Sequence, residues 1–140
     1  MKWRFFKALL RGGDPDAERI YRWHITARKA SNAKLGIGMD GKPDTDRYVS
    51  DCHRLLVSMR ANGFNPAYAI PIDPDGELLG GAHRTACALA LGIESVPVKR
   101  YEQKAWAPSW SLEWFKDNGM AADDFTRLSK DFDECMTSPR

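Results

Sequence analysis

The chain has 140 residues, of which 43% are hydrophobic and 29% are charged, and its formal net charge is +2. These values are typical of one soluble globular domain and exclude a disordered, fibrous or repeat protein. The small net charge does not by itself indicate a nucleic-acid-binding face. Three widely spaced cysteines argue against a disulfide framework or a zinc site, so we expect a reducing, cytoplasmic environment.

Residues 1–11 combine basic side chains with an apolar side, which consists of Trp3, Phe6, Leu9 and Leu10. The segment lacks the long apolar region and cleavage site of a signal peptide, and no stretch reaches membrane-spanning length. We expect an amphipathic helix that packs on its own domain or on a partner. Contact with an anionic membrane surface is the alternative.

A second helix is predicted from Pro15 to about Ala30, because Asp14-Pro15 combines a capping residue with proline at the first helical position. Its apolar residues recur at three- and four-residue steps, and they are Ala17, Ile20, Trp23, Ala27 and Ala30. His24 borders this stripe. We interpret it as a packing residue rather than a catalyst.

Residues 36–41 match the G-x-G-x-x-G pattern literally, but they follow a helix instead of a strand, so we expect a mobile glycine loop. A lid over a site is the alternative. Asp44-Thr45-Asp46 predicts a helix start and Asn62-Gly63 its end. The predicted buried stripe of this helix is Tyr48, Val49, Cys52, Leu55, Leu56 and Met59.

A β-hairpin is predicted next. Residues 69–72 form a short strand, Asp73-Pro74-Asp75-Gly76 is a tight turn, and residues 77–79 form the second strand. A further strand is expected at residues 96–98.

Gly80-Gly81 follows the hairpin directly, and residues 82–91 form a predicted helix that ends before Gly92. A helix N-terminus after glycines presents N–H groups and a partial positive charge, which together bind anions. His83, Arg84 and the Thr85 hydroxyl add donors. A plain turn with solvated side chains is the alternative. Cys87 lies inside the helix and is predicted to be a core residue.

The run from Ala69 to Lys99 reads strand, turn, Leu-Leu-Gly-Gly-Ala-His-Arg, alanine-rich helix, Gly-Ile and Val-Pro-Val. It resembles the ParB-like nucleotide-binding domain shared by ParB proteins, sulfiredoxins and free serine kinases. The resemblance implies an α+β fold with a short mixed sheet, packed helices and extra N- and C-terminal helices. It also implies a single domain over residues 1–136, with a nucleotide-binding core at 46–101, a helical extension with the glycine loop at 1–45 and an aromatic helical extension at 102–136.

In that superfamily the glycine turn binds nucleotide phosphates, and the resemblance carries this role to Gly81, His83 and Arg84. The local pattern of strand, glycines and helix adds Gly80 and Thr85 as candidates. The preceding helix also approaches the nucleotide in the family, which implies secondary roles for Arg54 and Ser58. The chain departs from two branches. Ala82 stands where sulfiredoxins have their cysteine, and Gly80 stands where the kinase branch has an acidic residue. Too few residues follow for the helix-turn-helix domain of the ParB branch.

We therefore predict a phosphotransferase that uses ATP or ADP, with CTP as an alternative, and Mg²⁺ to phosphorylate a small hydroxylated metabolite or sugar. Asp46 and Asp44, and less well Asp75, are the candidate bases or metal ligands, although each position also suits a helix cap or a turn. A non-catalytic nucleotide sensor is the first alternative. A nucleic-acid-binding protein that uses the basic residues of the segment 1–30 is the second.

The C-terminal part contains Trp106, Trp110 and Trp114, which are predicted to cover a core edge or, alternatively, to form a ligand platform. A helix is expected through Trp114 and Phe115 to Asn118-Gly119. The last twenty residues are polar and acidic, and residues 137–140 are predicted to be a disordered tail.

Overall fold

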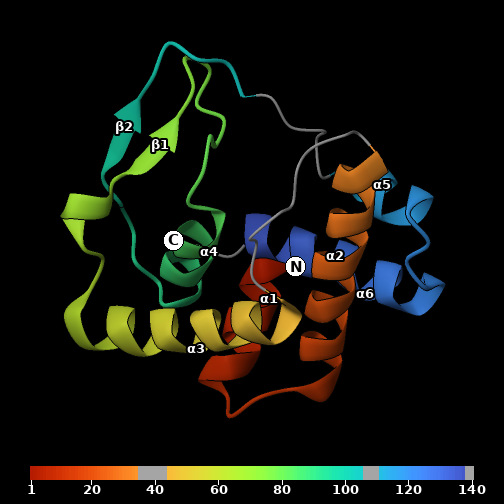
Figure 1. The fold of residues 1–140 in the computed structure, drawn as a ribbon. Helices are drawn as coiled ribbons and strands as arrows, with labels where there is room; N and C mark the ends of the chain where they lie inside the picture. Colours follow the sequence, from red (N-terminus) through yellow and green to blue (C-terminus); the bar gives the residue numbers. More distant parts are fainter. Residues whose placement is uncertain (35–43, 106–110, 138–140) are drawn as a thin grey trace.

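The computed structural model of the chain describes residues 1–34, 44–105 and 111–137. Within these ranges the elements are α1 (Lys2–Leu10), α2 (Pro15–Lys34), α3 (Thr45–Asn62), a 3₁₀ helix (Pro66–Tyr68), β1 (Ile70–Ile72), α4 (Ala82–Ala90), β2 (Val98–Arg100), α5 (Leu112–Asp117) and α6 (Ala122–Thr137). The chain is thus a small, mostly helical α+β protein. Figure 1 shows α2 beside the N-terminal end of α3, with the strands on one side of the molecule and α5 on the other.

The helix boundaries follow the predicted capping residues. The Asp14 carboxylate accepts a hydrogen bond from the Asp16 N–H at 2.9 Å where α2 begins. The Asp44 carboxylate accepts one from the Arg47 N–H at 2.7 Å where α3 begins. Gly63 ends α3 with φ of 71°, in the left-handed region that favours glycine. The α2 helix continues four residues beyond the predicted end, to Lys34.

The sheet is smaller than predicted and slightly displaced. β1 pairs with β2 in parallel, with Ile70 opposite Val98 and Ile72 opposite Arg100. The predicted hairpin is present, but its second strand is reduced to one antiparallel bridge between Ile72 and Leu78. The strand predicted at residues 96–98 lies at 98–100 instead. Pro97 has no N–H to pair and contributes only its carbonyl, which accepts the Ile70 N–H at 2.8 Å.

The larger hydrophobic core lies between α1, α2, α3 and α4. Phe5 and Phe6 of α1 are fully buried, and the Phe5 ring stacks on the Tyr21 ring at 4.4 Å between centroids. Cys52 and Cys87 are buried in the same cluster, which confirms both as core residues. The packing of α1 on its own domain is also confirmed. No helix in the described ranges is long and apolar enough to cross a membrane.

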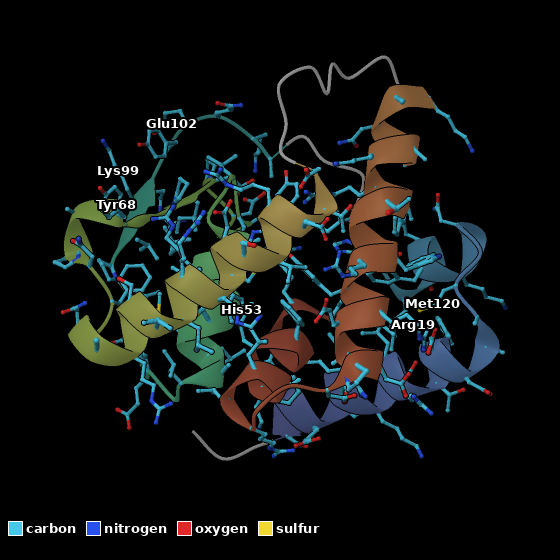
Figure 2. All side chains as sticks on the ribbon, turned by 60° about the horizontal axis from the view of Figure 1, so that its bottom comes forward. Arg19, His53, Tyr68, Lys99, Glu102 and Met120 are labelled. Atoms are coloured by element: carbon cyan, nitrogen blue, oxygen red, sulfur yellow. The ribbon has the colours of Figure 1, made fainter. Side chains whose placement is uncertain are left out.

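A second hydrophobic cluster joins α2 to α5 and α6, and its buried members are Ile20, Phe115, Met120 and Leu128. Figure 2 shows Arg19 and Met120 on this side of α2. Because α2 packs on both clusters, its buried residues extend beyond the predicted stripe to Tyr21 and Ile25. The predicted stripe residue Ala30 is exposed.

Ion pairs connect α6 to α1 and α2. The Arg19 guanidinium donates to both oxygens of the buried Asp124 at 2.7 Å each. One guanidinium nitrogen of Arg4, Nη1, donates to both oxygens of Asp131, at 2.9 and 3.0 Å. The acidic character of the last twenty residues therefore serves a structural purpose. Thr137, predicted to begin a disordered tail, is the last residue of α6, and residues 138–140 lie outside the described ranges.

The Phe5 stack gives a test of the larger core. We expect Phe5→Ala to lower the free energy of unfolding by about 3 to 5 kcal/mol, because it empties a buried aromatic position. Val57→Ala on α3 is the control, since Val57 is 70% exposed and its truncation should change stability by about 0.5 kcal/mol or less. Urea unfolding of both variants measures the difference. Equal losses would contradict a central position of Phe5 in the core.

Candidate functional site

The turn that begins α4 requires glycine. Gly81 caps the helix with φ of 75°, and a Cβ atom at this position would lie 2.9 Å from Ile70 Cδ1. The Gly81 carbonyl accepts the Thr85 N–H at 3.0 Å, and the Thr85 hydroxyl donates to the same oxygen at 3.2 Å. The N–H groups of residues 82–84 precede this first helical hydrogen bond, as in any helix start. The helix start that was predicted to bind an anion is therefore present, and its capping residue is a glycine without a side chain.

His83 points inward, toward α2 and α3. Its Nε2 atom lies 2.7 Å from the Tyr21 hydroxyl, which in turn lies 3.3 Å from Cys52 Sγ. The ring also lies beside that of Tyr48, at 6.1 Å between centroids. Burial, followed by the positive charges of Lys2 and Arg28, lowers the pKa of His83 to about 4, against a weaker opposing effect of Asp51. His83 is thus a neutral ring at pH 7.

Arg84 and Thr85 do not join His83. The Arg84 guanidinium donates to the Tyr68 carbonyl and lies close to Gly81, on the β1 side of the turn. The Thr85 hydroxyl turns back to the Gly81 carbonyl, as described above. Gly80 packs near Pro71, where a Cβ atom would lie 3.4 Å from Cγ. The three side chains predicted to act at one anion site therefore point in three directions, and only the backbone of the turn has the expected arrangement.

A small cavity of about 140 Å³ lies beside His83, lined by Tyr48, Asp51, Cys52, Leu55 and His83. Arg54 and Ser58, the secondary candidates on α3, are both exposed. The Arg54 guanidinium pairs with Oδ1 of Asp51, which also accepts a hydrogen bond from Arg47 Nε at 3.3 Å. One carboxylate therefore connects Arg54 to the wall of this cavity.

The predicted acidic candidates are used elsewhere. Asp44 caps α3 through its side chain, as described above. Asp46 is 82% exposed and pairs with Arg22 of α2 at 2.6 Å. Asp75 pairs with Lys104. None of the three lines the cavity beside His83, and within the described ranges no group of three His, Cys, Asp or Glu side chains is arranged to hold a metal ion.

Four residues near His83 had no predicted role: Lys2, Tyr21, Arg28 and Asp51. Burial and, to a smaller extent, the positive charge of Arg28 lower the pKa of Lys2 to about 8. The Arg28 guanidinium lies 5.7 Å from the centre of the Tyr48 ring. Tyr21 and Asp51 are far from the glycine turn in the sequence, and only the tertiary fold brings them to α4. No local sequence pattern could have predicted that they lie beside His83. Lys2 lies on the same side of α1 as Phe5 and Phe6, and this helical spacing is the sequence feature that could have predicted its burial.

A larger cavity, of about 540 Å³, lies away from the glycine turn, between the N-terminal end of α1 and the helices α5 and α6. His24 lines it and is 2% exposed, so its prediction as a packing residue is confirmed. Trp114 packs beside His24 and Phe115, as predicted for a tryptophan at a core edge. The predicted glycine loop at 36–41 lies outside the described ranges, as do Trp106 and Trp110.

Comparison with known proteins adds no relative. No protein-family model matches the chain, and no curated protein or solved structure is significantly similar to it. The resemblance to the ParB-like superfamily consequently stays a prediction.

Two glycines with similar backbone angles test the steric requirement at the turn. Gly92→Ala, at φ of 72° and with open space around its Cβ position, should lower the free energy of unfolding by about 1 kcal/mol. Gly81→Ala carries the same backbone strain and adds the contact with Ile70, so we expect a loss of about 2 to 3 kcal/mol. Thermal unfolding of the two variants compares them, and equal losses would show that the Ile70 contact is easily relieved.

The two buried histidines make stability depend on pH. Burial and nearby positive charges lower the pKa from 6.5 to about 4 for His83 and to about 2 for His24. The unfolded chain therefore binds more protons than the folded chain below pH 6.5, and stability falls as the pH falls from 6.5 toward 4. The expected slope is about 1.4 kcal/mol per pH unit for each histidine.

Urea midpoints between pH 7 and pH 4.5 measure this slope. His83→Gln should reduce it by about half, because one of the two contributing groups is removed. His53→Gln is the matched control, since His53 is exposed on α3 (Figure 2). An unchanged slope in His83→Gln would mean that His83 is protonated in the folded protein.

Proposed function

We propose that the start of α4 binds the phosphates of a nucleotide and that the protein transfers a phosphoryl group to a small hydroxylated metabolite or sugar. The observation that carries this proposal is the glycine-capped helix start beside a cavity that lies near the basic side chains of Lys2 and Arg28. The charges of Lys2 and Arg28 act on His83 in the wall of that cavity. Helix N–H groups and positive charge together favour a phosphate.

The size of the cavity limits which part of the ligand it holds. At about 140 Å³ it is smaller than typical small-molecule sites, which measure about 300 to 1,000 Å³. In this proposal one phosphate group occupies the cavity, and the sugar and base lie outside it. Arg54 and Ser58 are exposed on α3 and would be available to them, while Arg84 has guanidinium donors beyond the one given to Tyr68.

Asp51 fits the acidic role better than the residues chosen from the sequence. It lines the cavity, and both of its arginine partners bind Oδ1. Mg²⁺ usually keeps several waters and binds substrate phosphates, so in this proposal the nucleotide phosphates and water would hold it and would leave Oδ2 of Asp51 free. When bound, the ion would offset the negative charge of the phosphates.

The proposed reaction moves a phosphoryl group to the acceptor and a proton away from it. The acceptor oxygen forms a bond to the terminal phosphorus, and the bond from that phosphorus to its bridging oxygen breaks. ATP then leaves as ADP, or ADP leaves as AMP. The hydroxyl proton passes to Oδ2 of Asp51, the oxygen opposite the one bound by the arginines.

Binding without transfer is the second candidate function, and the positions of Asp44 and Asp46 favour it. Both predicted acidic residues are held in structural contacts away from the cavity. A nucleotide-binding sensor needs the helix start and the positive charges but no base. Nucleic-acid binding by the basic residues of the segment 1–30 receives less support, because Arg4, Arg19 and Arg22 are paired with carboxylates.

Calorimetry with ATP, ADP and CTP in the presence of Mg²⁺ tests binding, and phosphate transfer to pooled hydroxylated metabolites tests catalysis. We expect Arg84→Ala to weaken nucleotide binding about tenfold, through loss of a charge-assisted contact of about 1.4 kcal/mol. Asp51→Asn should retain binding and lose transfer. Arg60→Ala, an exposed arginine at the end of α3, is the control and should change neither.

The outcomes separate the candidates. Nucleotide binding without transfer by the wild-type protein would select the sensor. Absence of binding for all three nucleotides would exclude both nucleotide functions. Salt-sensitive DNA binding would then identify the nucleic-acid alternative.

A further inference from the structure

The cavity of about 540 Å³ has the size and lining of a small-molecule site. Its apolar wall comes from α1, α5 and α6 and consists of Trp3, Leu112, Phe115, Leu128 and Phe132. Three of these side chains are aromatic, and such faces bind planar apolar groups. The glycine turn contributes no residue to this wall, so the cavity is separate from the nucleotide site proposed above.

Basic groups lie near His24 on the polar side of this cavity. Burial has the largest effect on His24, and the positive charges of Lys2, Arg28 and the Met1 amino group lower its pKa further. Asp131 also lines the cavity, but the Arg4 guanidinium binds both of its oxygens, which balances its charge. The remaining carboxylate in the lining belongs to Glu113, which is exposed and therefore well solvated.

Among the described residues, Lys2 has the one Lys or Arg side chain in the lining of this cavity, which Met1 also borders. Burial lowers the pKa of the Lys2 amine. Among the described residues, the ion pairs of the protein involve other basic side chains and leave Lys2 out. A partly buried ammonium group without a carboxylate partner is unfavourable, and an anionic ligand supplies that partner.

We propose that this cavity binds a small aromatic monocarboxylic acid, with its apolar body between the aromatic walls and its carboxylate against the Lys2 ammonium group. A single lysine side chain in a mainly apolar cavity matches a singly charged carboxylate better than the several charges of a nucleotide. The site is independent of the proposed phosphotransferase function and stands if that function fails.

Calorimetry with 4-phenylbutyrate and its neutral analogue 4-phenylbutanol tests the charge requirement. The wild-type protein should bind the acid at least tenfold more tightly than the alcohol at pH 7. Lys2→Met keeps the length of the side chain and removes the charge, so both ligands should bind with similar affinity. Lys7→Met, on the same helix but outside this lining, is the control and should retain the tenfold preference.

The preference should also decrease above about pH 8, as Lys2 loses its proton. Equal affinity for acid and alcohol in the wild-type protein, or an unchanged preference in Lys2→Met, would overturn the proposed role of Lys2. Absence of binding of both ligands at millimolar concentration would overturn the site itself.

Filling the cavity tests its location. Leu128→Trp should abolish binding of both ligands and leave nucleotide binding unchanged, with circular dichroism as the check on folding. Phe132→Ala is the second variant, because Phe132 is 54% exposed and its truncation should not prevent folding. It should lower the affinity for the acid and the affinity for the alcohol by the same factor of about three, since it removes only apolar contact. Unchanged affinity in both variants would show that the ligands bind elsewhere.

Discussion

The side chain of Tyr21 connects four helices, and the orientation of α4 depends on it. Its ring stacks on Phe5 of α1, while its hydroxyl contacts Cys52 of α3 and His83 of α4. Burial and the Cys52 contact raise the pKa of the Tyr21 hydroxyl, so the group remains protonated. A buried hydroxyl requires hydrogen-bond partners, which explains why His83 turns inward. The same residue thus completes the larger core and sets the direction of the His83 side chain at the helix start.

Local signals predicted much of the fold. Asp14, Asp44, Gly63 and Gly92 act through backbone conformation or hydrogen bonds within a few residues, and the helix ends lie at or near them. Features that depend on distant contacts were missed. The sequence did not predict where α6 begins and ends, because its acidic residues gain their arginine partners only when α1 and α2 pack against it. The shift of β2 reflects the missing N–H of Pro97, whose effect depends on pairing with β1.

The candidate site divides in the same way. Its backbone was predictable, because a glycine turn before a helix is read from adjacent residues, and Gly81 has the left-handed conformation that only glycine adopts easily. Its side chains were not. The direction of His83 depends on Tyr21, which is 62 residues away, and the charge around it depends on Lys2 and Arg28. Only three-dimensional packing makes these residues neighbours, so sequence spacing contains no signal for them.

The position of Lys2 has a consequence for the two proposed sites together. Its charge acts on His83 beside the smaller cavity and on His24 beside the larger one. An anion that pairs with Lys2 in the larger cavity offsets part of the positive potential at the start of α4. By thermodynamic reciprocity, a phosphate bound at α4 would lower the affinity of the larger cavity for the carboxylate by the same factor. If both proposals hold, two anion sites that share one cation would oppose each other, and α1 would couple the binding of the two ligands.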